Sequence, residues 1–232
     1  MSTPPDPPQK SGYRRLLVGF NHQIESRTAL DLAAKLAEAV QTELAGVFVM
    51  DQDLLDMARL PFTTEILRAS RQTRNLDPAA IELELRATAE LMQRRLRQLA
   101  LRAHRQCSFR TVHGHLLRAL MAQAEAGDLI LLRQTDLPWP GGRQTVLAMD
   151  GPVVLMTPAA AGGDGLENLA RQIAQVLQKT FIAAPMDTPL AKLSELRPGL
   201  VIAPADMFES SDDKAVKRFT DAVRCPVLIA PV

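Results

Sequence analysis

The sequence LLVGFNHQIESRTALDLAAKLAEAVQTELAGVFVM, residues 16–50, decides the fold because it holds two strands and a helix in one unit. Its first five residues form a nearly continuous apolar run, which is typical of a parallel strand covered on both faces. Apolar residues then recur at helical spacing between Ala29 and Val40, so one face of a helix is apolar. A second apolar run, from Leu44 to Met50, predicts another strand. Together these elements predict a right-handed βαβ unit in a parallel sheet.

The composition indicates a globular chain with an aliphatic core. Of the 232 residues, 47% are apolar and only 4% are aromatic, and the formal net charge is +1. The charges are balanced along the chain, which argues against a nucleic-acid partner. No apolar segment is long enough for a membrane span and none follows the pattern of a signal peptide, so we expect a cytoplasmic protein without a membrane partner. Cys107 and Cys225 lie in strand-like runs and are predicted to be buried, reduced thiols.

Further elements follow in a regular order. The proline-rich residues 1–12 predict a disordered leader. The connection 51–76 is predicted to hold one or two short helices. Asp77 and Pro78 fit the N-cap and the first position of a long helix that reaches about Arg105. The remaining predicted strands are 107–113, 128–132, 151–156, 181–184, 200–203 and 225–231, and the remaining predicted helices are 115–126, 166–177, 190–196 and 213–223.

Two parts of the chain resemble a known family. Residues 16–49 resemble the opening of a universal stress protein, in which a strand and an Asp-Gly-Ser-like turn precede Glu-Ser-x-x-Ala-Leu, Ala-x-x-Leu-Ala and a second strand. Here Asn21, His22 and Gln23 stand in place of Asp, Gly and Ser. Residues 112–132, with Val-x-Gly-x-Leu-x-x-Ala-Leu and then Gly-Asp-Leu-Ile-Leu-Leu, resemble the third strand, third helix and fourth strand of that family. The last residues, RCPVLIAPV, are similar to its closing strand.

A second, shorter series of elements begins at Gly151. GPVVLMTP, from Gly151, and CPVLIAPV, from Cys225, resemble each other, which indicates an internal repeat. The resemblance therefore implies an α/β fold of two flavodoxin-like or Rossmann-like parallel-sheet halves in tandem, of the type found in adenine nucleotide alpha hydrolases. We expect a universal-stress-protein-like domain at 13–150 and a shorter, degenerate half at 151–232. The strand 151–156 either closes the first half, opens the second or serves both.

The resemblance also predicts that a phosphate site is missing. In nucleotide-binding members of the family, the fourth strand leads into Gly-x-x-Gly-x9-Gly-Ser/Thr, whose backbone amides hold the phosphates. In this chain the corresponding segment is 133–145, where Gly141 and Gly142 are adjacent and Pro138 and Pro140 lack amide donors. We therefore predict no bound cofactor, with ATP or AMP as the nucleotides to consider.

Candidate nucleotide-binding residues follow from the same resemblance. Asn21 and His22 lie at the carboxyl end of the first strand, where open α/β sheets place ligands, and Asn21 would bond to an adenine or ribose. The second strand would offer backbone groups beside Val49, and Gly114 matches a family glycine. The alternative interpretation is a polar turn at Asn21 and a strand-end turn at Gly114. The pair His113 and His115 has no carboxylate or cysteine nearby in the sequence, so no metal site is predicted.

These features predict a non-catalytic stress-response protein with lost or weakened ATP binding. One alternative is an ATP- or AMP-binding, or ATP-hydrolysing, universal stress protein. Another is a protein–protein interaction module in which the helix 78–105 and the connection 51–76 cover an unknown protein partner. The family commonly dimerises through its last strand, so we expect a homodimer or an intramolecular pseudo-dimer. In the pseudo-dimer, the strands Gly151–Met156 and Cys225–Pro231 are predicted to pair inside the chain.

Overall fold

The structure is a computed structural model that describes residues 12–21, 27–60, 63–66, 73–75, 77–132, 150–157, 164–209 and 213–231. Three predicted features lie outside these residues. They are nearly all of the N-terminal leader, the candidate residue His22, and the segment that takes the place of the phosphate loop.

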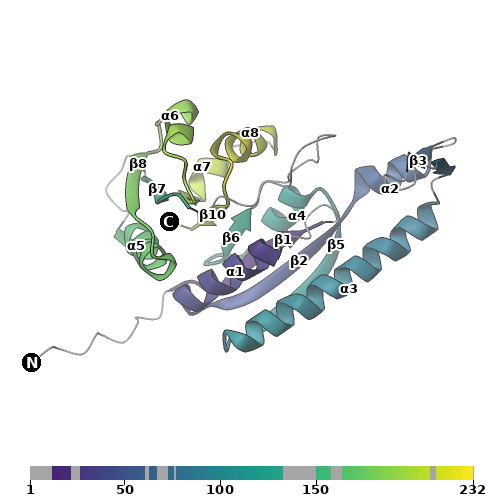
Figure 1. Cartoon of the computed structure of the whole chain (residues 1–232), viewed down its shortest axis with the longest axis horizontal. Coiled ribbons are helices and arrows are strands. Elements are labelled where there is room, and N and C mark those ends of the chain that lie inside the picture. Colours follow the sequence, from purple (N-terminus) through teal and green to yellow (C-terminus); the bar gives the residue numbers. More distant parts are fainter. Residues whose placement is uncertain are drawn as a thin grey trace, which may run out of the picture.

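One sheet of eight strands runs through the molecule, in the order β5-β2-β1-β6-β10-β9-β7-β8 (Figure 1). Neighbouring strands are parallel except β6 and β10, which are antiparallel. The predicted α/β class is thereby confirmed, with a mixed sheet in place of separate parallel ones. The strands are β1 (Arg15–Phe20), β2 (Glu43–Asp51), β5 (Cys107–Gly114), β6 (Leu129–Leu132), β7 (Val153–Thr157), β8 (Phe181–Pro185), β9 (Leu200–Pro204) and β10 (Val227–Ala230).

The first βαβ unit forms as its apolar pattern predicts. β1 and β2 pair in parallel from Arg15 opposite Glu43 to Phe20 opposite Phe48, and α1 (Arg27–Val40) connects them. Successive residues of a strand point to opposite faces, so Leu16 belongs to the core on one face of the sheet and Leu17 to the core on the other. A strand that is buried on both faces must be apolar throughout, which explains the continuous run in the sequence.

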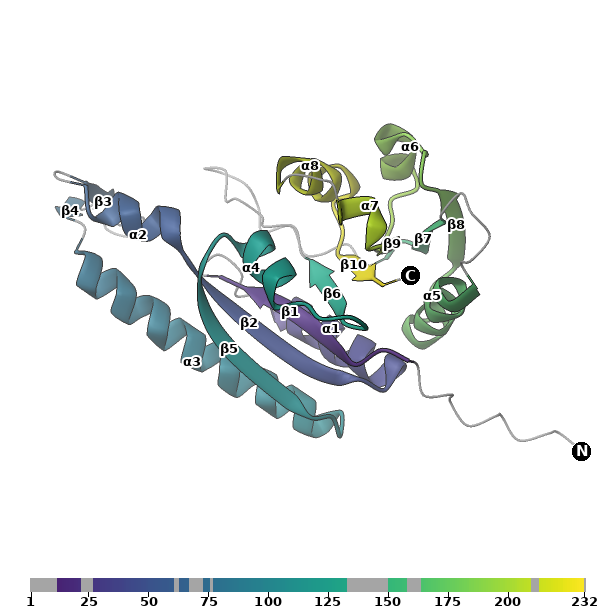
Figure 2. The same ribbon diagram turned by 180° about the vertical axis from the view of Figure 1, so that it is seen from behind.

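Helices cover both faces of the sheet (Figures 1 and 2). The core on one face includes residues of α1, α3 (Pro78–Arg102) and α5 (Asp164–Leu177). The core on the other face includes residues of α4 (Leu116–Gln123), α6 (Leu190–Glu195), α7 (Asp206–Glu209) and α8 (Asp213–Val223). On the first face α1 and α5 lie against each other, and Gln172 Nε2 donates a 2.6 Å hydrogen bond to the carbonyl oxygen of Ala39.

The connection between β2 and α3 contains the predicted short helix and also a hairpin that was not predicted. Its described residues form the helix α2 (Gln52–Ala58) and a two-stranded antiparallel sheet of β3 (Thr64–Ile66) and β4 (Thr73–Asn75). Strands of three residues are too short to show an apolar period, which explains why the sequence did not reveal them. The start of α3 agrees with its prediction, because Asp77 Oδ1 accepts a 3.0 Å hydrogen bond from the amide of Ala79 and Pro78 follows the cap.

The last strand lies in the middle of the sheet. β10 pairs with β9 on one side and with β6 on the other, where Leu228 faces Leu131. The predicted direct pairing of strands 151–156 and 225–231 is wrong, because β9 lies between β7 and β10. The error has a physical reason: the apolar pattern of a buried strand shows that it has neighbours but not which ones.

Two smaller predictions concern cysteines and membranes. Both cysteines are free thiols, as predicted, although Cys107 is only half-buried while Cys225 is buried.

Among the helices that the structure describes, none combines the length and the apolarity needed to cross a membrane.

Candidate functional site at the carboxyl edge of the sheet

The strand order has a topological switch point at β1. The chain proceeds from β1 to β2 and β5 on one side, and then returns to β6 on the other side of β1. In open α/β sheets, ligands bind at such a switch point, at the carboxyl ends of the strands. Asn21 directly follows β1 and therefore lies at this point, as the sequence predicted. Its side chain is buried, and the residue as a whole is 7% exposed.

The other predicted nucleotide residues lie on the neighbouring strands. Phe20 pairs with Phe48, so Asn21 and Val49 are at the same level of the edge. Val49 is 1% exposed and belongs to the core beneath α4. Gly114 pairs with Asp51 and lies two strands from β1, about 10 Å away at the usual strand spacing. The structure thus brings Asn21 and Val49 together and places Gly114 at a distance.

The backbone of Gly114 explains its residue type. Its φ is +131°, a conformation that residues with a side chain rarely adopt. A Cβ at this position would meet no atom within 4 Å, so space is not what requires glycine there. The turn at Gly114 ends β5 and leads directly into α4.

Three exposed or half-exposed polar side chains converge at the same edge. Asp51 ends β2, Asp53 lies in the first turn of α2, and His115 is the N-cap residue of α4. One donor atom of each lies within 4.8 Å of the other two. His115 Nδ1 and Asp53 Oδ2 are 3.5 Å apart. This cluster, Asp51–Asp53–His115, brings two neighbouring aspartates close to a histidine that is distant in the sequence.

Sequence reasoning missed this cluster although its parts were visible. His115 was considered without a carboxylate partner, because none lies near it in the sequence. The parallel pairing of β2 and β5 supplies one, since Met50 lies opposite His113 and Asp51 opposite Gly114. The signal was the pattern Asp-x-Asp directly after β2 together with a histidine directly after β5. The exposed His113 is not part of the cluster.

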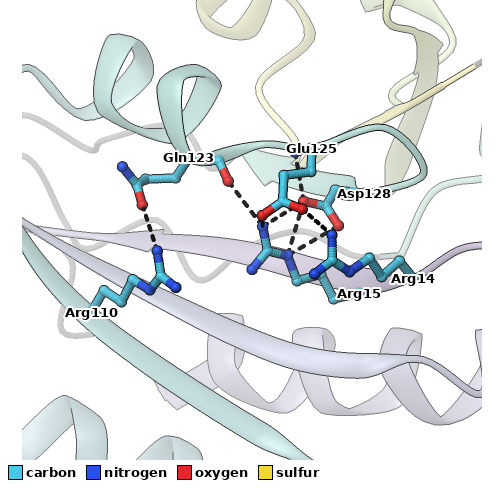
Figure 3. A network of polar contacts seen from close by, with 6 residues as sticks. All are labelled: Arg14, Arg15, Arg110, Gln123, Glu125 and Asp128. Carbon is cyan, nitrogen blue, oxygen red and sulfur yellow. Dashed lines mark hydrogen bonds and ion pairs between the residues drawn. The ribbon is translucent and has the colours of Figure 1, made fainter.

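The opposite, amino edge of the sheet carries a structural network (Figure 3). The side chain of Asp128 is fully buried and accepts hydrogen bonds from Arg15 Nε at 2.9 and 3.0 Å and from the amide of Glu125 at 2.8 Å. The pKa of Arg15 is raised, mainly because its guanidinium donates hydrogen bonds to the Asp128 carboxylate. Arg15 also donates to the carbonyl oxygen of Gln123 at 3.0 Å, so the network fixes the end of α4 to β1.

A shallow hollow lies beside this network, on the sheet face that α4 covers. Arg15, Ser108, Arg110 and Gln123 contribute to its lining, and its volume of about 10 Å³ has room for about one water molecule. The hollow also lies on the edge away from the switch point. We therefore place the candidate site at the carboxyl edge.

Neither cysteine is suited to nucleophilic chemistry. Burial raises the pKa of Cys225 to about 12 and also raises the pKa of Cys107. Because the thiolate is the nucleophile, both residues are unreactive thiols near neutral pH.

No family model matches the chain, and no curated protein matches it. Several solved structures match the chain. A universal stress protein from Archaeoglobus fulgidus has 9% identity and a TM-score of 0.49, with 96% of this chain and 99% of that chain covered. A putative universal stress protein from Pseudomonas aeruginosa has 11% identity and a TM-score of 0.48, covering 96% and 94%. A protein of the universal stress protein family from Burkholderia pseudomallei has 16% identity and a TM-score of 0.35, covering 96% and 98%.

The chain is similar to universal stress proteins over nearly its whole length.

Proposed function

We propose that the chain is a non-catalytic stress-response protein, related in role to universal stress proteins, in which nucleotide binding at the switch point is lost or weakened. The role in stress follows from the sequence resemblance. Weakened nucleotide binding is supported by the carboxyl edge of the sheet, where two carboxylates, Asp51 and Asp53, lie close together.

These carboxylates oppose a phosphate group by charge. Among the ion pairs between described residues, none joins a lysine or arginine to Asp51 or Asp53. The nearby Arg59 is directed to Asp56, at 3.4 Å. Like charges brought together at a binding site reduce affinity unless a cation lies between them. A nucleotide polyphosphate near this part of the edge therefore meets repulsion.

The side chain predicted to contact a base is also poorly placed for it. Asn21 is buried, so a nucleotide at the edge would have little access to its side-chain amide. Burial raises the pKa of both thiols, so neither is activated as a nucleophile, in keeping with a non-catalytic role.

Calorimetric titration with ATP, ADP and AMP tests this function. In buffer with Mg²⁺ and without transition metals, we expect no heat beyond dilution at millimolar nucleotide. The matched variants are Asn21→Ala at the switch point and Asn168→Ala, an exposed asparagine on α5. A micromolar Kd for any of these nucleotides would overturn the proposal, and its loss in Asn21→Ala but not in Asn168→Ala would place that binding at the switch point. ATP turnover with the same dependence would instead establish the ATP-hydrolysing alternative.

A further inference from the structure

The cluster Asp51–Asp53–His115 has the donor geometry of a metal site. An ion with tetrahedral ligands at about 2.0–2.1 Å holds its donor atoms about 3.4 Å from one another. His115 Nδ1 and Asp53 Oδ2 already have nearly this separation, at 3.5 Å. The third donor, on Asp51, lies within 4.8 Å of both. Because Asp53 and His115 are exposed, small side-chain rotations suffice to bring all three donors to one ion.

The local hydrogen bonds also leave donor atoms of the cluster available to an ion. Asp51 uses Oδ1 to accept a 3.0 Å hydrogen bond from the amide of Asp53, which caps α2 and leaves Oδ2 available. His115 stands at the N-cap of α4 but makes no capping hydrogen bond with its side chain. Its imidazole is directed to Asp53 instead, at a distance longer than a normal hydrogen bond.

Charge and donor type indicate which ion fits. The two aspartate side chains bring negative charge to the cluster, which favours a divalent cation. Imidazole and carboxylate together suit first-row ions such as Zn²⁺, whereas Mg²⁺ and Ca²⁺ prefer oxygen donors alone. Three protein donors leave the remaining positions of the ion to water.

We propose that Asp51, Asp53 and His115 form a binding site for one divalent first-row metal ion of the Zn²⁺ type. The site joins the end of β2, the first turn of α2 and the start of α4. The site is tested without nucleotide, whereas the repulsion argued under the proposed function is that of the metal-free carboxylates.

Titration of the untagged, metal-free full chain with Zn²⁺, followed by calorimetry, tests the site. Co²⁺ serves as a second probe, because its visible absorption reports nitrogen and oxygen ligands directly. We expect one equivalent to bind. His115→Ala is expected to weaken Zn²⁺ binding by at least about tenfold, and Asp53→Asn likewise, since losing even a supporting group of a metal ligand commonly costs 10–100-fold.

His113→Ala is the matched control, because this exposed histidine lies two residues away and outside the cluster. It is expected to leave Zn²⁺ affinity and the Co²⁺ spectrum unchanged. Circular dichroism checks that each variant folds, and Asp53→Asn provides a second test should His115→Ala not fold. The proposal is overturned by no binding at millimolar Zn²⁺. It is equally overturned by binding that survives both cluster variants, or that His113→Ala weakens as much as His115→Ala.

Discussion

Asp128 is a fully buried carboxylate whose charge is balanced by Arg15, a guanidinium with 12% of its side chain exposed. A charge in this position is tolerated only while its partner is present, because desolvation without compensation is costly. The exposed Glu125 also contacts Arg15, at 3.2 Å, but solvent screens that interaction. Asp128 is therefore expected to contribute more to the stability of the fold than Glu125.

We predict that Asp128→Asn lowers the free energy of unfolding by about 3–5 kcal/mol, because it leaves the largely buried guanidinium of Arg15 with only the exposed Glu125 as an anionic partner. Glu125→Gln, its control, is expected to cost no more than about 1 kcal/mol, as for an exposed ion pair. Urea unfolding of both variants measures the difference. Equal losses in the two variants would show that burial of Asp128 does not determine its contribution.

The stability of the long helix α3 depends on Asp77, the N-cap residue just before its first turn. Asp77 Oδ1 bonds to the amide of Ala79 and satisfies one of the free donors at the helix start. Asp77→Ala is expected to lower the free energy of unfolding by about 1 kcal/mol. Asp31→Ala, in the interior of α1 and exposed, is expected to change it by less than about 0.5 kcal/mol. Urea midpoints that do not distinguish the two variants would contradict the capping role.

The sequence predicts those elements whose pattern lies in residues that are close together in the chain. The β1-α1-β2 unit and the cap at Asp77 follow from residues that are close in the chain. The hairpin of β3 and β4 has no such signal, because each strand is only three residues long. At the site, Asn21 was placed correctly by the end of its strand. The meeting of Asp53 and His115 was not predicted, because it depends on which strands pair.

At the scale of the whole molecule, we propose that residues 13–150 and 151–232 are two related halves. In the first half β1 lies between β2 and β6, and in the second half β7 lies between β8 and β9. In each half, the first strand thus has the next strand of the chain on one side and a later strand on the other. This shared order supports the relation between the halves. β10 then lies against β6 of the first half, so the two halves share one sheet.

The central claim is that β10 is an interior strand that joins these halves within one chain. Hydrogen exchange, followed by mass spectrometry on protein that elutes with the mass of one chain, tests this most directly. An interior strand has hydrogen-bonded neighbours on both sides and exchanges only through large openings. We predict that the amides of β10 are protected as strongly as those of β9, and more strongly than those of the edge strands β5 and β8. Exchange in β10 as fast as in the edge strands would contradict the claim.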